Sequence, residues 1–379
     1  MTQQIKTAYL ISCSDHYGHR LHAIDGYLRS QGYHTTYLTS DFDHTSKTPF
    51  TCHVPGCVQL PTRPYRKNLS LARILSHRSF ARDAFRYLEA LSEQPDLVVV
   101  LLPPNFLAHY AAKYRKKHPN VKLIFDIFDM WPETFPFGRL KILLKPVFSV
   151  WAWIRNHNLD AADLVTTECA LFRRLLKLPE DRSAVVPLCA QPLPSQPATL
   201  REDTLDLCYL GAINNVISIP DICALIGQLI KSKPVTLHII GKGERQQEFI
   251  DAATAAGANV EFYGAVYDEE TKQSIMGKCH FGLNIMKSSV CVGLTMKSVD
   301  YFRFGLPILN NIPADTEELV NREGIGLQLN EQTPNAVLAM EQRDFLRMRS
   351  DVRRVFGERF ATSVIEKQYD SILSDLLVK

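Results

Sequence analysis

The chain has 379 residues, of which 46% are hydrophobic and 22% charged, a composition typical of soluble globular proteins and a length that fits two domains. No stretch approaches the ~18 uninterrupted apolar residues of a transmembrane helix, so we expect no membrane-spanning segment. The nine cysteines form no Cys-x-x-Cys pair and no signal peptide is evident, so we expect a reducing, cytoplasmic location.

The charge is unevenly distributed along the chain. Residues 1–180 hold 23 Lys and Arg against 15 Asp and Glu, a net +8, while residues 181–379 hold 20 against 25, a net −5. Basic residues concentrate in 63–86 and 113–117. Taken singly they fit solvated helix faces, but the imbalance between the halves predicts an anionic partner for the first half. Nothing predicts a nucleic-acid partner.

Apolar runs rich in β-branched residues alternate with helical patterns along the whole chain. In the first half, buried parallel strands are predicted at 8–13, 35–40, 96–102, 122–128 and 163–167. A proline-rich stretch follows, and a second β-α series starts after it. We therefore expect an α/β fold of two doubly wound, Rossmann-like domains facing a central cleft. The expected boundaries are 1–185 for the N-terminal domain, 186–204 for a linker, 205–357 for the C-terminal domain, and 358–379 for a helix packing back towards the first domain.

The segment Val290–Asn310, VCVGLTMKSVDYFRFGLPILN, carries the most specific pattern. Gly293 and Thr295 precede an amphipathic run, where a helix N-terminus offers unpaired N–H groups and partial positive charge to a phosphate. Lys297 adds a full charge, and Asp300, three residues later, falls on the same helical face. A carboxylate there can bind two ribose hydroxyls, so the segment predicts a nucleoside diphosphate site.

Two other strands of the second half end in loops of a similar kind. They are YLGAINN, residues 209–215, and HIIGKGE, residues 238–244. A Gly-x-Gly turn alone is a weak signal, because such turns often serve only the chain reversal. Parallel strands bring their carboxyl ends to one edge, so the three loops together predict one donor site.

These pieces resemble the nucleotide-sugar domain of GT-B-fold, retaining, family-four-like glycosyltransferases of bacterial capsular and exopolysaccharide biosynthesis. The matching stretches are YLGA, HIIGKGE, VEFYGAV, CHFGLN and GLTMKSVDYFRFGLPILNN. The first half, with SDHYGHR, YLTSDFDHTSK and DIFDMWPE, resembles the acceptor domain of the same family. The resemblance implies sugar transfer from a nucleotide diphosphate sugar, above all a UDP-sugar, to a lipid-linked saccharide. It also implies retained anomeric configuration, no bound metal and no other cofactor.

The resemblance assigns roles to individual residues. Asp300 would hold the ribose, and Thr295 and Lys297 would lie near the diphosphate, Lys297 with a catalytic role. Val266 would meet the base through its backbone. The expected donor-binding set is Gly18, Arg20, Gly211, Asn214, Gly243, Glu244, Val266, Asn284, Thr295, Lys297 and Asp300.

The chain also departs from the family pattern. Val292 stands where many relatives have the first of two glutamates, and Asn214 and Asn215 replace a basic pair. Two other readings therefore stay open: a non-catalytic GT-B-fold partner subunit, and a nucleotide-sugar epimerase of the same fold. The sugar, base, acceptor, linkage and oligomeric state are not specified by the sequence.

In the first half, Gly18 could approach the phosphates closely and Arg20 could supply positive charge. Asp129, after a predicted strand, could orient or deprotonate an acceptor hydroxyl, or could equally cap a helix at Trp131-Pro132. We expect His16 and His44 to be polar loop residues. Cys52, His53 and Cys57 lie close in sequence but lack a second ligand group, so no zinc site is predicted there.

The segment 139–155, RLKILLKPVFSVWAWIR, combines basic edges with an apolar body. One interpretation is a domain helix with a buried face. The other is an interfacial helix, with Trp151 and Trp153 at the polar boundary of a membrane. The implied lipid-linked acceptor fits the second, so we expect the protein at the inner face of the cell membrane, bound peripherally to anionic lipid.

Overall fold

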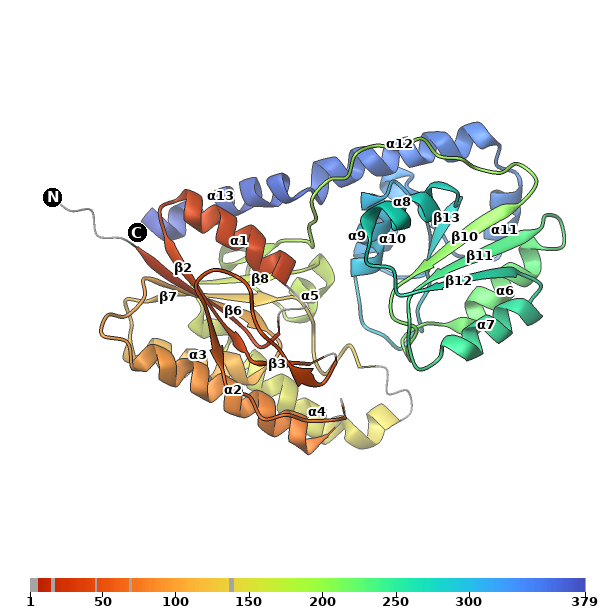
Figure 1. The fold of residues 1–379 in the computed structure, drawn as a ribbon. Coiled ribbons are helices and arrows are strands. Elements are labelled where there is room, and N and C mark those ends of the chain that lie inside the picture. Colours follow the sequence, from red (N-terminus) through yellow and green to blue (C-terminus); the bar gives the residue numbers. More distant parts are fainter. Residues whose placement is uncertain (1–5, 15–17, 45, 68–69, 136–139, 379) are drawn as a thin grey trace. The chain divides into compact units, whose positions relative to one another are not determined.

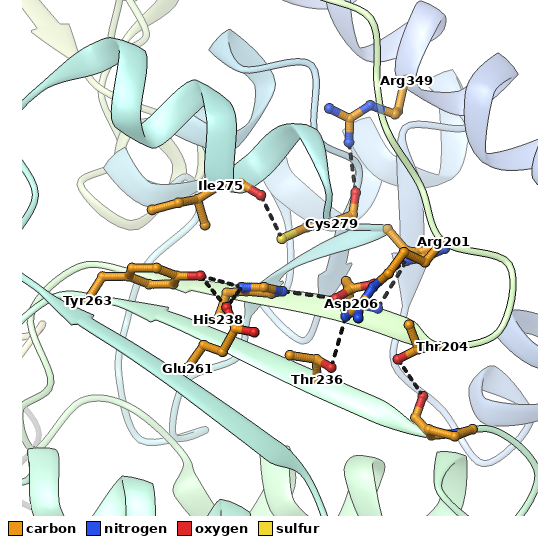
Figure 2. Close-up of polar contacts among 12 residues, drawn as sticks. Arg201, Thr204, Asp206, Thr236, His238, Glu261, Tyr263, Ile275, Cys279 and Arg349 are labelled. Carbon is orange, nitrogen blue, oxygen red and sulfur yellow. Dashed lines mark hydrogen bonds and ion pairs between the residues drawn. The ribbon is translucent and has the colours of Figure 1, made fainter.

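The computed structural model describes residues 6–14, 18–44, 46–67, 70–135 and 140–378 (Figure 1). It divides into two compact units, Met1–Cys189 together with Ile365–Lys379, and Ala190–Val364. No helix among the described residues is long and apolar enough to cross a membrane.

Unit 1 is built on a parallel sheet of seven strands in the order β5-β2-β1-β6-β7-β8-β9. Their bounds are β1 Thr7–Ser12, β2 His34–Ser40, β5 Cys57–Leu60, β6 Leu97–Leu102, β7 Lys122–Ile127, β8 Leu164–Thr167 and β9 Ser183–Val185. The central strand β6, LVVVLL, is buried at every position because helices cover both faces of the sheet.

The helices of unit 1 follow its strands in the usual alternation. They are α1 Gly18–Ser30, α2 Leu71–Glu89, α3 Phe106–Lys117, α4 Leu140–Asn156 and α5 Ala170–Leu175. A short antiparallel pair, β3 Phe42–Asp43 and β4 Thr48–Pro49, follows β2. In this sheet the strand order reverses between β1 and β6, so the unit is doubly wound.

Unit 2 repeats this plan with six parallel strands in the order β12-β11-β10-β13-β14-β15. The strands are β10 Leu205–Leu210, β11 Val235–Ile240, β12 Asn259–Gly264, β13 Phe281–Asn284, β14 Ile308–Asn310 and β15 Gly326–Gln328. The helices are α6 Ile219–Leu229, α7 Gln246–Ala255, α8 Glu269–Gly277, α9 Met296–Arg303, α10 Asp315–Glu323, α11 Thr333–Leu338 and α12 Gln342–Arg359. The order reverses between β10 and β13. The predicted fold class of two doubly wound α/β domains is thus confirmed.

The segment expected as a linker, 186–204, is buried near its start and at Thr204, and is largely exposed in between, where a few backbone contacts hold it. Val186 is buried in the core of unit 1. Further on, the Gln196 carbonyl accepts a hydrogen bond from Arg353 at 2.8 Å, and the Thr199 N–H donates to the Gly277 carbonyl at 3.0 Å. Proline blocks regular secondary structure here, and contacts with unit 2 hold the backbone instead.

The last helix, α13 Thr362–Val378, belongs to unit 1 through most of its length. Ile365, Tyr369 and Leu373 are buried in the unit 1 core, and the Tyr369 ring stacks at 6.5 Å on Tyr27 of α1. The C-terminal helix therefore completes the hydrophobic core of the unit that the N-terminal half forms.

Candidate functional site

The candidate donor site lies at the carboxyl edge of the unit 2 sheet, beside the reversal in strand order. β10 ends at Leu210 and continues into Gly211, while β13 ends at Asn284 and leads to α9. Ligands of open α/β sheets bind in the crevice outside the strand carboxyl ends at such a reversal. The fold therefore places the loops predicted from the sequence where a ligand is expected.

The start of α9 is fixed by a capping box. Thr295 is the N-cap residue, and its hydroxyl accepts from the Ser298 N–H at 3.0 Å and donates to Asn284 Oδ1 at 2.9 Å. Asn284 in turn donates to Asn310 at 2.7 Å, and all of these side chains are buried. Thr295 and Asn284 are thus positioned near the predicted site, but their polar atoms hold the helix start together. The N–H groups of Met296 and Lys297 have no acceptor among the described residues, so they stay available to an anion.

Lys297 lies in the first turn of α9 with its Nζ 4.1 Å from the centre of the Tyr209 ring. Burial lowers the pKa of Lys297 to about 7, because no carboxylate within the described residues compensates the charge. A desolvated cation that lacks a counter-charge is well suited to bind phosphate oxygens.

Asp300 lies one turn along α9 from Lys297. Burial raises the pKa of its carboxyl to about 6, against smaller opposing effects of Lys272 and Arg303. Neither cation forms an ion pair with it within the part of the chain that is described; Arg303 instead pairs with Glu269 at 2.5 Å. An acidic group kept half-buried and unpaired is costly, and such groups cluster at functional sites.

The glycines of the neighbouring loops permit close backbone packing. A Cβ on Gly241 would lie 1.9 Å from the Gly211 carbonyl oxygen, and one on Gly243 would lie 2.1 Å from that of Ile213. A Cβ on Gly211 would in turn lie 3.5 Å from Cε of Lys297. The three loops therefore converge as predicted, and the Gly-x-Gly turn is explained by loop packing rather than by approach to a phosphate.

The remaining predicted donor residues of unit 2 are spread along these loops. Asn214 accepts from the Val216 N–H at 3.0 Å within its own turn, and the exposed Asn215 donates to Glu244 at 2.6 Å. Val266 is half-buried in the loop after β12. The asparagine pair thus orders its own loop and orients Glu244, which differs from the direct ligand contact that a basic pair would make.

In unit 1 the predicted role of Arg20 is wrong. Its guanidinium is buried, donates from Nε and Nη2 to Asp126 at 2.8 and 2.5 Å, and donates from Nη1 to the Val186 carbonyl at 2.7 Å. All its charge is used inside the unit, so it is not a phosphate ligand. Gly18 begins α1, and the prediction for His16 falls outside the described residues.

Asp129 lies just beyond the carboxyl end of β7, as predicted. It accepts from Nε1 of Trp131 at 2.7 Å, and burial raises the pKa of its carboxyl. The alternative role as a helix cap is not realised, because residues 131–134 form a turn instead of a helix. Burial thus makes this carboxylate more basic than an exposed one, which suits a general base.

The two tryptophans of α4 have different surroundings. Trp151 packs against Phe135 at 5.7 Å and Trp131 at 6.3 Å between ring centres, whereas Trp153 is 57% exposed. Val147 and Val150, on the same side of the helix as Trp153, are also exposed. The buried-face interpretation of 139–155 thus holds at Trp151, whose ring packs against other aromatic rings of the unit and does not fit the expected place at a membrane boundary. The interfacial interpretation stays a prediction for the exposed residues, and Arg139 falls outside the described residues.

One group was not anticipated from the sequence: Cys13, His44 and His77 lie close together in unit 1. His44, expected as an ordinary loop residue, contacts both Cys13 and Tyr65. No sequence spacing signals this group, because its members come from three separate elements.

The comparisons with known proteins are consistent with this geometry. No family model matches the chain, and no curated protein sequence matches it. Solved structures match it along nearly its whole length. The lipopolysaccharide outer core galactosyltransferase WaaB, apo form, is 12% identical with a TM-score of 0.63, covering 98% of this chain and 99% of that chain.

Anabaena HepE in complex with UDP is 14% identical with a TM-score of 0.65, covering 98% and 100%. The catalytic domain of Arabidopsis thaliana starch synthase IV, bound to ADP and acarbose, is 11% identical with a TM-score of 0.66, covering 100% of both chains. At this identity the similarity shows the fold alone, which is the GT-B fold.

Proposed function

We propose that the protein is a glycosyltransferase that moves a sugar from a nucleotide diphosphate sugar to a saccharide acceptor. The observation that carries this proposal is the pair Lys297 and Asp300. Both ionisable groups lie on one turn of α9, at the strand carboxyl ends of a GT-B domain, and neither has an ion-pair partner among the described residues. A nucleoside diphosphate supplies what each lacks, phosphate oxygens for the cation and hydroxyls for the carboxylate.

The proposed chemistry assigns each group one task. Lys297 and the free N–H groups of α9 would stabilise the negative charge that develops on the leaving diphosphate. Asp300 would fix the ribose, and Asp129 would orient or deprotonate the acceptor hydroxyl. Protein groups alone would perform the phosphate work, so no Mg²⁺ or Mn²⁺ is needed, and the anomeric configuration would be retained.

The donor class and the acceptor class rest on different support. HepE is described in complex with UDP and with UDP-glucose, which favours a UDP-sugar donor here. WaaB is described as a galactosyltransferase of the lipopolysaccharide outer core, which favours a lipid-linked acceptor in cell-surface polysaccharide assembly. We place the protein at the inner face of the cell membrane.

The described part of α4 supports a peripheral membrane contact. Val147, Val150 and Trp153 are 56%, 60% and 57% exposed, and Lys145 beside them is exposed too. An apolar strip beside a basic side chain can bind the headgroup region of an anionic membrane through a shallow wedge and electrostatic attraction, whereas Arg155, at the end of the helix, is buried and pairs with Glu133.

A panel of nucleotide sugars, screened by thermal shift and then assayed for transfer, tests the proposal. A donor held at 100 times its Kd raises the unfolding free energy by about 2.7 kcal/mol. We expect one UDP-sugar to stabilise the protein and to serve as donor with no gain from added Mg²⁺ or Mn²⁺. Binding without transfer would indicate a partner subunit, and interconversion of sugar epimers would indicate an epimerase. No stabilisation by any nucleotide sugar would refute the donor site.

A further inference from the structure

Cys13, His44 and His77 meet at the carboxyl edge of the unit 1 sheet. Cys13 follows β1, His44 follows β3, and His77 lies in α2. Each offers one metal-binding atom, and these atoms all lie within 4.8 Å of one another. Within the described residues no other three Cys, His, Asp or Glu side chains meet this condition, and Cys52, His53 and Cys57 do not.

The orientation of His44 suits a metal ligand. Its Nε2 lies 3.2 Å from Sγ of Cys13, and its Nδ1 lies 2.8 Å from the hydroxyl of Tyr65. A histidine that binds metal through one nitrogen nearly always donates its other N–H to an oxygen, which fixes the ring and its tautomer. Tyr65 provides that oxygen.

His77 supplies the independent sign that a ligand is missing. It is 2% exposed, its ring stacks on Trp131 at 5.8 Å, and it meets the His44 ring edge-on at 5.3 Å. Its Nδ1 is buried and has no hydrogen-bond partner in the described part of the chain. Buried polar atoms are almost always satisfied, so an unpartnered nitrogen on a buried histidine that meets a thiol and a second imidazole points to a ligand.

The electrostatics keep both imidazoles in the form that binds metal. Burial, with a smaller effect of Arg73, lowers the pKa of His44 to about 4 and lowers that of His77 well below its usual value. Both rings are therefore neutral at pH 7. Burial raises the pKa of the Cys13 thiol, so an ion would have to displace its proton.

Positive charge near the group opposes a bound cation, and the types of ligand decide which cation gains most. Arg73, whose Cζ lies 4.3 Å from the centre of the Trp131 ring, and Lys47 lower the pKa of both histidines, and Asp43 opposes them at His44. This field opposes a cation, and conversion of the Cys13 thiol to thiolate offsets one unit of the ion's charge. Hard cations such as Mg²⁺ and Ca²⁺ gain little from sulfur and imidazole, whereas zinc prefers both.

We propose that Cys13, His44 and His77 bind one zinc ion. On binding, a Zn–S bond forms, the thiol S–H bond breaks, and the proton leaves to solvent. Three protein ligands leave a fourth position for water or an exogenous oxygen, the donor pattern of zinc sites that handle substrates. His77 stacks on Trp131, whose Nε1 binds Asp129, so the site adjoins the residue proposed to act on the acceptor.

The test uses the full-length protein, stripped with chelator and titrated with Co²⁺ as the spectroscopic probe and with Zn²⁺ as its competitor. We expect one Co²⁺ per chain, a thiolate-to-cobalt charge-transfer band, displacement by Zn²⁺, and release of one proton per ion. Cys13→Ser should abolish the band. Cys52→Ser is the matched control and should keep it.

A folded parent protein that binds no Co²⁺, or a band that survives in Cys13→Ser, would overturn the proposal. Should Cys13→Ser fail to fold, X-ray absorption of the zinc-loaded parent decides the matter. One sulfur and two imidazole nitrogens around zinc support the assignment, and any shell without sulfur contradicts it. Because these measurements need no donor, they are independent of the proposed transferase activity.

Discussion

The ammonium of Lys297 lies 4.1 Å from the centre of the Tyr209 ring, and no carboxylate in the described chain pairs with it. Tyr209 is a buried residue of β10, so the first turn of α9 packs against a strand that borders the reversal in strand order. The contact holds a cation in a partly desolvated place, where it destabilises the unliganded fold and favours an anion.

Replacing Lys297 should raise the stability of the unliganded protein and weaken donor binding. Lys297→Met keeps the length of the side chain and removes the charge. The pKa of Lys297 falls from 10.5 to about 7 on folding. Protonated Lys297 therefore lowers the unfolding free energy by its full amount below pH 7, and this penalty disappears as the pH rises to 10.5. We expect a higher melting temperature at pH 6, and donor affinity reduced by about 1.5–3 kcal/mol through loss of charged hydrogen bonds.

Thermal unfolding and calorimetric titration of the same preparations check both parts. Lys231→Met, at an exposed lysine of the same unit, is the control and should change neither quantity. Unchanged donor affinity in Lys297→Met would remove the lysine from the site.

Donor affinity should pass through a maximum near pH 6–7. Above the Lys297 pKa of about 7 the ammonium loses its proton and attracts the diphosphate less. Below the Asp300 pKa of about 6 the carboxyl gains a proton and accepts ribose hydroxyls less well. Titrations in buffers of different ionisation enthalpy should show proton uptake on binding above pH 7. Affinity that stays flat from pH 5 to 9 would contradict this assignment.

The Gly-x-Gly turn provides a stability test. Gly243→Ala places a Cβ 2.1 Å from the Ile213 carbonyl oxygen, so the loops must separate, at a cost of about 1–3 kcal/mol in unfolding free energy. Gly227→Ala, inside α6 with nothing within 4 Å of the new Cβ, should instead be neutral or stabilising by about 0.5–1 kcal/mol. Denaturant unfolding measures both, and equal effects of the two substitutions would disprove the packing role.

The membrane contact should depend on Trp153 and not on exposed apolar residues elsewhere. We expect sedimentation with anionic liposomes at low salt, release by salt, and little binding to neutral liposomes, because the attraction fades within a Debye length of about 8–10 Å. Trp153→Ser should weaken it, whereas Leu175→Ser, at a residue 51% exposed on α5, should not. Equal loss in both variants, or no binding by the parent, would argue for a soluble acceptor.

The sequence was enough to predict the fold, because the central strands contain contiguous apolar runs and the segments between them show the 3.6-residue apolar period of covering helices. The run LVVVLL needs no tertiary information to be recognised as an interior strand. The loop-to-helix segment around Lys297 and Asp300 was predictable for the same reason, since all its parts lie within a few residues.

What the sequence did not reveal depends on contacts between distant segments. The sequence predicted Arg20 as a phosphate ligand, whereas the structure pairs it with Asp126, which is 106 residues away. Trp151 and Trp153 are two residues apart, yet their opposite environments depend on Phe135 and Trp131. The grouping of Cys13 with His44 and His77 likewise exists only once three elements have come together.

The most direct test of the account is the donor affinity of Asp300→Ala measured by calorimetry with the UDP-sugar that stabilises the parent. Removal of an unpaired, half-buried carboxylate should leave the protein folded and no less stable above pH 6. It should weaken donor binding by about 1–3 kcal/mol, through loss of charge-assisted hydrogen bonds to the ribose. Asp251→Ala, at an exposed carboxylate on α7, should bind like the parent. A folded Asp300→Ala protein that binds every donor as tightly as the parent would contradict the assignment of α9 as the nucleotide-sugar site.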